Sequence, residues 1–370
     1  MDKDWLIFVG TLPWVFFLMV VLLCDSSNGR KQKKLVGLFL FAFIFAAIRY
    51  GIGYDYYSYK HVIDGNSYDY ELERLEILPR YLAIISGKIH FQIFFAVCSF
   101  LTIYPVYFVS RKLSINPLKS FVVYLLFPLF FLEGLGVIRN AVAYSLVLLM
   151  FYYISKKRYF YSLLLWGLSI GFHSSAIVAV LLYPLFFSFH KRSLHFVLYL
   201  FSFMLAVYIM PILISIAPNI PVATKVLSNV DKEMASTGGL LFYVVNGIAI
   251  FHFLCWNKLL IADQRNKIYL SLVNVGICFW NVFLSLDPTT AQRLSLFFLL
   301  FLILVAPYYK YISIRNRAFI KKSMTAILVL LFVSSLGLNL YAYYFRGRNM
   351  SNIPYQVFFL NPSDVFLHIN

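Results

Sequence analysis

The chain has 370 residues and a formal net charge of +17; 61% of its residues are hydrophobic, 13% are charged, and the mean hydropathy is +0.79. A soluble globular protein is nearer half apolar and a quarter charged, so this composition excludes a soluble protein and indicates one embedded in a lipid bilayer. The Lys and Arg residues lie in short clusters between apolar runs, which is typical of the loops of a membrane protein and not of a nucleic-acid-binding surface. We therefore expect no nucleic-acid partner.

A helix needs roughly 20 mainly apolar residues to cross a bilayer, and by that rule the chain contains about twelve spans. We predict an all-α, polytopic membrane protein with a single transmembrane domain over residues 1–370. The expected spans are 5–24, 35–48, 90–110, 118–134, 137–154, 159–172, 174–188, 194–216, 239–256, 267–286, 292–309 and 323–345. The first span is expected to be retained, because no small-residue cleavage site follows it. A shorter apolar stretch, Ile77–Ile89, carries Arg80 and Lys88 and is interpreted as an interfacial or re-entrant helix.

Basic residues cluster in alternate loops, at 30–34, 111–119, 156–158, 191–192, 258–267 and 310–322. The accompanying acidic residues there are Asp25 and Asp263, so the positive-inside rule places these loops in the cytoplasm and both chain termini outside. The outer side then receives two long loops, 49–76 and 217–238, and a C-terminal tail, 346–370. The polar residues that need a functional explanation lie on that side.

Several kinds of site are not indicated by the sequence. The four cysteines lie within or at the ends of apolar runs and lack the CxxC spacing of a zinc site. The acidic residues of the first outer loop do not follow EF-hand spacing. The chain also has no P-loop, no Rossmann fingerprint and no G-x-S-x-G motif. We therefore expect no metal, no cofactor and no soluble nucleotide substrate.

The second predicted span ends in a motif rich in glycine and tyrosine, Arg49-Tyr-Gly-Ile-Gly-Tyr-Asp-Tyr-Tyr-Ser-Tyr59. Gly51 and Gly53 allow a sharp turn or a close approach to a ligand, and Arg49 and Asp55 supply opposite charges. Two interpretations remain open: a helix exit with a local ion pair, anchored by an aromatic belt, or a loop that binds sugar and phosphate. In the second case, the candidate sugar-binding residues are Tyr54, Tyr56 and Tyr59.

Glu76 and Arg139 are the next candidates along the chain. Most acids of the first outer loop are expected to be solvated, but Glu76 opens the apolar stretch that contains Arg80 and could serve as a general base. Arg139 lies at the outer end of an otherwise apolar helix, where an ionisable group is costly and by default marks a functional site. The alternative is that Arg139 extends to the lipid headgroups or pairs with Glu133.

His173 and Arg293 complete the set of candidates. His173 lies where two short predicted spans meet outside, and it is either a catalytic group or a structural histidine. Arg293 opens another span and is either an anion ligand or a headgroup anchor. Guanidinium groups bind phosphate through paired hydrogen bonds and stay charged at any working pH. We therefore predict that Arg49, Arg139 and Arg293 converge on a lipid-linked pyrophosphate at the membrane surface.

The quoted residues resemble the signatures of the EpsG-like family of bacterial exopolysaccharide and O-antigen polymerases, which are Wzy-type enzymes. The segment from Arg49 to Tyr59, followed by Glu76, resembles the first signature. Two segments resemble the central signature of the family, Val137-Ile-Arg-Asn140 and Phe172-His-Ser-Ser-Ala176. Further along the chain, Arg293 and Ile353-Pro-Tyr355 also fit the family pattern. Two departures are visible: Asn140 stands where the family usually has Gln, and Tyr54 stands where it has a small residue.

The resemblance implies a polytopic glycosyltransferase, similar to the membrane-embedded C-type enzymes, in the bacterial inner membrane with its active site facing the periplasm. Its donor and acceptor would both be undecaprenyl-pyrophosphate-linked oligosaccharides, held among membrane lipids, and a chain-length regulator is a candidate partner. The growing glycan would pass from its carrier to the non-reducing end of a new lipid-linked repeat unit. The arginines would neutralise the leaving pyrophosphate, and the candidate bases for the acceptor hydroxyl are His173, Asp55 and Glu76.

Two other functions remain open. A flippase for lipid-linked oligosaccharides also has about twelve helices, but it needs polar groups that line a cavity through the membrane midplane. Here the charged residues collect at the outer ends of the spans, and the span centres are nearly bare. An O-antigen ligase would use similar outer Arg and His residues, and the family signatures alone favour a polymerase over it.

Overall fold

The computed structural model describes residues 3–26, 31–65, 72–209, 239–285, 287–312, 316–346 and 352–358. The predicted outer loop 217–238 and most of the predicted C-terminal tail lie outside the described residues. The chain folds into two compact units, one formed by Met1–Ala176 with Ala318–Asn370 and the other by Ile177–Arg317. This division does not test the prediction of one transmembrane domain, which stays a prediction.

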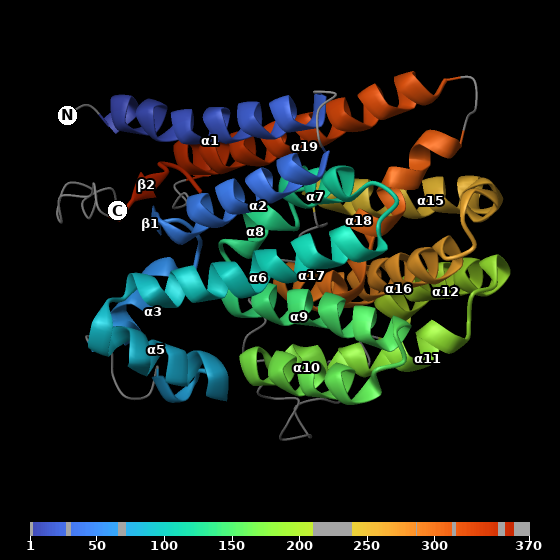
Figure 1. Ribbon diagram of the computed structural model, residues 1–370, viewed down its shortest axis with the longest axis horizontal. Helices are drawn as coiled ribbons and strands as arrows, with labels where there is room; N and C mark the ends of the chain where they lie inside the picture. Colours follow the sequence, from blue (N-terminus) through green and yellow to red (C-terminus); the bar gives the residue numbers. More distant parts are fainter. Residues whose placement is uncertain are drawn as a thin grey trace. The chain divides into compact units, whose positions relative to one another are not determined.

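The first unit is built almost entirely from helices (Figure 1). They are α1 (Lys3–Ser26), α2 (Lys31–Ala47), α3 (Tyr56–Ile63), α5 (Ile77–Ile89), α6 (Gln92–Leu113), α7 (Pro117–Leu126), α8 (Phe131–Gly134), α9 (Ile138–Ser155), α10 (Tyr159–Phe172) and α19 (Arg317–Arg346). A short antiparallel pair, β1 (Arg49–Tyr50) and β2 (Gln356–Val357), places Arg49 opposite Val357. The pair joins the start of the first outer loop to the segment that follows α19.

The second unit is also helical. Its elements are η1 (Ser174–Leu181), which begins in the first unit, α11 (Leu182–Phe187), α12 (Arg192–Met204), η2 (Leu205–Ile209), α15 (Gly239–Ala262), α16 (Asn266–Leu284), α17 (Pro288–Leu299), α18 (Leu302–Val305) and η4 (Ala306–Tyr311). Asn246 and Asn281 bond to each other at 3.1 Å, and Tyr199 and Ser202 bond to them at 3.0 and 3.2 Å. These bonds link α12, α15 and α16 through neutral polar groups, as is common between membrane helices.

The all-α architecture is confirmed, and each of the twelve predicted spans contains helix within its described residues. Fewer helices meet the length and composition of a full crossing. Among the described residues, six do so: Ile7–Ser26, Gln92–Leu113, Ile138–Ser155, Leu241–Ala262, Asn266–Leu284 and Lys322–Tyr341. A further candidate is Pro288–Leu299 with Leu302–Tyr311, which is bent by 40°. The count of twelve spans and the outer position of both termini therefore stay predictions.

Prolines explain why one expected span is broken. The predicted span 118–134 is divided into α7, which ends at Leu126, and the short α8, which begins at Phe131. Pro128 lies between them, and the residue before a proline is disfavoured in the helical conformation. By contrast, α5 has the bounds that the sequence predicts for a separate short helix, Ile77–Ile89. Its position at the membrane interface stays a prediction.

Residues 352–358 lie between α1 and α2 and hold the start of the first outer loop. The Trp14 indole donates to the Asn352 carbonyl at 2.7 Å, and the Tyr355 amide donates to the Gly10 carbonyl at 2.9 Å. The Tyr355 ring stacks on Phe45 with 4.2 Å between ring centroids. Because β2 follows directly and pairs with β1, this segment fixes the backbone from which Arg49 emerges.

A buried ion pair fixes the opposite ends of three helices in the first unit. The Lys119 ammonium on α7 lies 2.8 Å from the Asp25 carboxylate on α1, and the two side chains are only 3% and 9% exposed. Thr325 on α19 accepts from Lys119 at 2.5 Å and donates to Asp25 at 3.1 Å. The two charges neutralise each other, and Thr325 forms hydrogen bonds to both. Such a buried pair specifies how α1, α7 and α19 meet.

Candidate functional site

The candidate site in the first unit is organised around an ion pair between Arg139 and Glu76. Arg139 is the second residue of α9, and Glu76 is the residue that precedes α5, with extended backbone angles. The Arg139 guanidinium contacts one carboxylate oxygen of Glu76, and the side chains are 23% and 20% exposed. Two residues 63 positions apart are thus held together at the surface of the unit. The pairing of Arg139 with Glu133, considered from sequence, is not what the structure has.

Tyr59 on α3 completes the contacts of Arg139. The Arg139 Nε donates to the Tyr59 hydroxyl at 2.7 Å, and the guanidinium carbon lies 5.8 Å from the centroid of the tyrosine ring. Burial raises the pKa of Tyr59, so its hydroxyl stays neutral and its oxygen accepts the bond. The nearby charge of Asp55 also raises this pKa, which places Asp55 close to the same group. The guanidinium is therefore held in a fixed orientation beside the Tyr59 hydroxyl.

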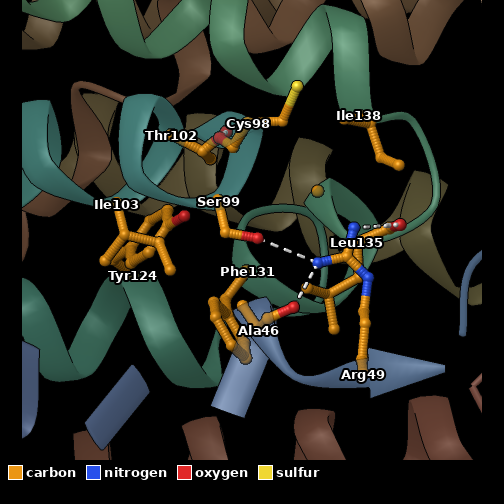
Figure 2. A pocket seen from close by; sticks show the side chains of 11 residues that line it. Ala46, Arg49, Cys98, Ser99, Thr102, Ile103, Tyr124, Phe131, Leu135 and Ile138 are labelled. Carbon is orange, nitrogen blue, oxygen red and sulfur yellow. Dashed lines mark hydrogen bonds between the residues drawn. The ribbon is translucent and has the colours of Figure 1, made fainter. Parts of the chain in front are cut away.

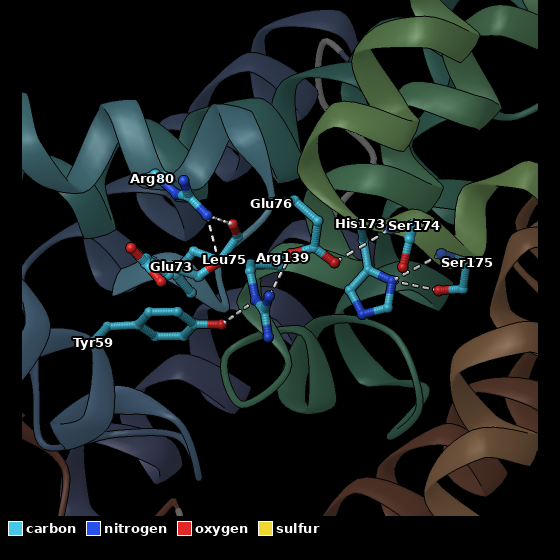
Figure 3. Close-up of polar contacts among 9 residues, drawn as sticks. All are labelled: Tyr59, Glu73, Leu75, Glu76, Arg80, Arg139, His173, Ser174 and Ser175. Atoms are coloured by element: carbon cyan, nitrogen blue, oxygen red, sulfur yellow. Dashed lines mark hydrogen bonds and ion pairs between the residues drawn. The ribbon is translucent and has the colours of Figure 1, made fainter. Parts of the chain in front are cut away.

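The second carboxylate oxygen of Glu76 is held by the turn that contains His173 (Figure 3). The Ser174 amide donates to that oxygen at 3.3 Å. The Ser175 amide donates to His173 Nδ1 at 3.3 Å, and the Ser175 hydroxyl contacts the same nitrogen. One carboxylate thus connects the starts of α5 and α9 with the turn between α10 and η1. Glu76, Arg139 and His173, all candidates from sequence, are brought together here.

Arg80 shapes the segment just before Glu76 and is a residue whose role the sequence did not reveal. Its guanidinium donates to the carbonyl of Leu75 at 3.2 Å and to that of Glu73. These bonds fold the chain back on the first turn of α5 and fix the approach to Glu76. The sequence signal for it was a charged residue inside an otherwise apolar stretch.

The turn before α9 is packed directly against the glycine-rich loop. Gly53 has a φ of +104°, and a Cβ built there would lie 2.2 Å from the Leu135 carbonyl oxygen. A Cβ at Gly136 would lie 3.1 Å from the Tyr54 ring. The contact at Gly53 leaves no room for a side chain, whereas a Cβ at Gly136 would require the Tyr54 ring to move by a few tenths of an ångström. This contact sets the position from which Arg139 projects.

Arg49 lies inside the unit and not at its surface. A residue that binds pyrophosphate, as predicted for Arg49, was expected at the surface. The side chain is 1% exposed and donates to the Ala46 carbonyl at 2.6 Å, the Ser99 hydroxyl at 3.0 Å and the Leu135 carbonyl at 3.4 Å (Figure 2). Burial lowers its pKa to about 10, so it is still charged at neutral pH. Its polar partners are these groups and not Asp55, so the local ion pair considered from sequence does not form. In this position Arg49 supports the turn before Arg139.

The cavity beside Arg49 is too small for a substrate. It measures about 10 Å³ and is lined by Arg49, Ser99, Thr102, Tyr124 and neighbouring apolar groups (Figure 2). A space of this size holds a single water molecule at most. This cavity therefore does not hold a ligand larger than water.

The three candidate sugar-binding tyrosines have different environments. Tyr54 is 63% exposed, whereas Tyr56 is fully buried and stacks on Phe95 with 4.2 Å between centroids. Tyr59 is 4% exposed and serves as the hydrogen-bond partner of Arg139. Only Tyr54 of the three presents its ring to solvent, so the geometry leaves stacking on a sugar to Tyr54 and gives the other two internal roles.

Arg293 lies in the second unit, near the start of α17. The helix is capped by Asp287, whose carboxylate accepts from the Thr290 amide at 2.7 Å, and Arg293 is partly buried in the first two turns. The predicted convergence of Arg293 with Arg139 concerns two different units and stays a prediction. Within the described residues, no group of three His, Cys, Asp or Glu side chains is placed to hold a metal ion.

We predict that Gly53→Ala lowers the activity of this site by roughly 100-fold, because moving the turn by about 1 Å displaces Arg139. The added Cβ would collide with the Leu135 carbonyl at 2.2 Å, and the positive φ adds strain. The matched control is Gly65→Ala, where φ is +71° but a Cβ would meet nothing within 4 Å. Equal loss in both variants, measured with purified protein at matched yield, would assign the effect to backbone strain and not to the contact with the turn.

Comparison with known proteins gives one result. The model of the EpsG family matches residues 35–357, which is nearly the whole chain and includes Arg49, Glu76, Arg139, His173 and Arg293. No curated protein and no solved structure matches the chain.

Proposed function

The chain belongs to the EpsG family of polymerase-like proteins for exopolysaccharide and O-antigen, and we propose that it is a membrane glycosyltransferase that polymerises oligosaccharide repeat units. The substrates are undecaprenyl-pyrophosphate-linked oligosaccharides, one as donor and one as acceptor. The protein acts in the bacterial inner membrane, with the Arg139–Glu76 site open to the periplasm. A lipid-linked substrate suits a site at the outer ends of apolar helices, because its tail stays in the bilayer while its headgroup reacts above it.

One observation carries this proposal: a guanidinium and a carboxylate, both about one-fifth exposed, form an ion pair that is held by Tyr59 on α3 and by the Ser174 amide in the His173 turn. A guanidinium fixed by Tyr59 is oriented to bind a pyrophosphate oxygen. Transfer from pyrophosphate requires such neutralisation of the leaving group, and preorganised charges are the largest contribution to reactions of this kind. Arg293 would add a second guanidinium if the two units bring it to the same headgroup.

The proposed reaction uses Glu76 as the base. The bond between the anomeric carbon of the donor glycan and the pyrophosphate oxygen breaks, and the electron pair leaves with the pyrophosphate. The acceptor hydroxyl oxygen forms the new bond to that carbon, and its proton passes to Glu76. A bound pyrophosphate competes with Glu76 for Arg139, and the oxygen of Glu76 that Arg139 releases can then accept the proton. Asp55, which lies near Tyr59, is the second candidate for this task.

The proposal is tested by the size of the surface polysaccharide in cells that lack this gene, with and without complementation at matched expression. Glycan reduced to single repeat units would mean that repeats still cross the membrane and are attached, so polymerisation is the missing step. Complete loss of surface glycan, with single lipid-linked repeats trapped inside, would instead identify a flippase. Long polymer that accumulates on its lipid carrier would identify a ligase. A change in the length distribution alone would point to the chain-length regulator that we include among candidate partners.

A further inference from the structure

The hydrogen bonds of His173 determine which of its ring nitrogens carries the proton. His173 lies between α10, which ends at Phe172, and η1, which begins at Ser174, and its backbone is extended. The Ser175 backbone amide donates to His173 Nδ1 at 3.3 Å. A backbone N–H has no role except as a donor, so Nδ1 must present its lone pair. A neutral imidazole with a lone pair on Nδ1 has its proton on Nε2.

The contact with the Ser175 amide disfavours the two other protonation states of the ring. A ring with its proton on Nδ1, or a cationic ring, would point an N–H at the N–H of Ser175. The Ser175 hydroxyl also contacts Nδ1, and it can donate to the same lone pair. The one lone pair of the neutral ring is therefore used by the turn, and Nε2 is a donor.

From this geometry we propose that His173 is a neutral hydrogen-bond donor, through Nε2, to the pyrophosphate of the lipid-linked donor substrate, and is not the base. The inference rests on the proposed function and assigns a role within the same site. His173 is adjacent to Ser174, whose amide holds one oxygen of Glu76, while Arg139 holds the other (Figure 3). The Glu76 carboxylate thus fixes the guanidinium directly and the imidazole through the neighbouring Ser174 amide. His173 Nε2 and the Arg139 guanidinium are then both hydrogen-bond donors, and neither accepts a proton. Two such donors suit an anionic leaving group.

The chain contains a matched example of the same turn outside the site. At the junction of α5 and α6, the Gln92 amide donates to His90 Nδ1 at 3.1 Å, with the same spacing of two residues. His90 contacts Phe91 and Phe358 and does not contact Arg139 or Glu76. It provides a control for substitutions that preserve or remove such a turn.

Two amide substitutions separate the functions of the two nitrogens. Asparagine at 173 places its oxygen near the position of Nδ1, so His173→Asn keeps the turn and removes the Nε2 donor. Glutamine reaches the position of Nε2, so His173→Gln keeps a donor there. Neither amide accepts a proton at neutral pH. We expect His173→Gln to retain activity within about 10-fold of wild type and His173→Asn to lose roughly 100-fold or more, as when one donor to a developing anion is removed.

The measurement uses the full chain in lipid nanodiscs, with repeat-unit transfer and binding of undecaprenyl pyrophosphate as two separate readouts. We expect binding of this probe to weaken in His173→Asn and to be retained in His173→Gln, while His90→Asn leaves both readouts unchanged. Equal inactivity of the two variants, with unchanged binding, would make His173 the base and overturn the proposal. If His173→Asn kept its activity and His173→Gln lost it, the role of His173 would be to cap the turn, and the proposal would be overturned. Failure of wild-type transfer with normal pyrophosphate binding would count against the proposed function and not against this assignment.

Discussion

Replacing Arg139 with alanine should abolish polymerisation while the protein is still inserted in the membrane. The guanidinium is the charged group that Tyr59 and Glu76 orient at the surface of the first unit. Without it, the pyrophosphate loses a positive partner whose attraction grows as negative charge develops on the leaving group. Such an interaction is worth about 100-fold to 1000-fold in rate. We expect both a lower kcat and a higher KM, because the same group binds the substrate before the reaction. Arg139→Lys should recover part of the activity, since it keeps the charge but not the planar fork.

Loss of activity in Arg139→Ala must be separated from loss of folding, because the change leaves the Glu76 carboxylate partly buried without its partner. The double variant Arg139→Ala with Glu76→Gln removes both charges, so it should be expressed normally and still be inactive. Arg158→Ala is a matched control, because Arg158 is exposed and precedes α10, at the other end of α9. Polymer of full length in Arg139→Ala cells would remove Arg139 from the site. Detection is by the size profile of surface glycan and by transfer in nanodiscs.

The sequence predicted the architecture where a local pattern determines it. Composition alone indicates a helical membrane protein, and the polar ends of the apolar stretch Ile77–Ile89 define a helix with the bounds that the structure has. Glu76, Arg139 and His173 could be selected for a similar reason. Each is an ionisable residue next to an apolar helix end, where such a residue needs a specific explanation.

The environment of each residue could not be predicted in the same way. Arg49 and Arg139 have equivalent positions in the sequence, at the predicted outer end of an apolar run, yet one is 1% exposed and the other is partly open. The difference arises because Arg49 lies in β1, which pairs with β2 from the far end of the chain, whereas Arg139 lies in the first turn of α9. Tyr56 and Tyr59 likewise face inward because α3 has one side against α6, where Phe94 and Phe95 receive their rings.

The number of membrane spans could not be predicted reliably for a similar reason. Hydropathy measures how apolar a stretch is, but not whether the helix is continuous within it. The stretch 118–134 is mainly apolar and is nevertheless divided at Pro128, and the last apolar stretch of the second unit is bent by 40° between Leu299 and Leu302. Broken apolar helices of this kind are tolerated where other protein segments satisfy their backbone groups.

Glu76→Gln should reduce transfer by about 100-fold to 10,000-fold, which is the usual contribution of a general base. The side chain keeps its size, and its amide oxygen can still accept from the Ser174 amide or from Arg139. What the variant loses is the negative charge and the ability to take the proton of the acceptor hydroxyl.

The two possible roles of Glu76 predict different kinetics. A base acts in the reaction itself, so its loss lowers kcat and leaves KM unchanged, whereas loss of a group that only orients Arg139 raises KM as well. Glu73→Gln is the matched control, because Glu73 is exposed and only its backbone carbonyl contacts Arg80. If Glu76→Gln transferred repeat units at the wild-type kcat, the proton would have to pass to Asp55, and Asp55→Asn should then show the loss. The proposed neutral donor at His173 takes no proton, so that proposal leaves the proton to one of these two carboxylates.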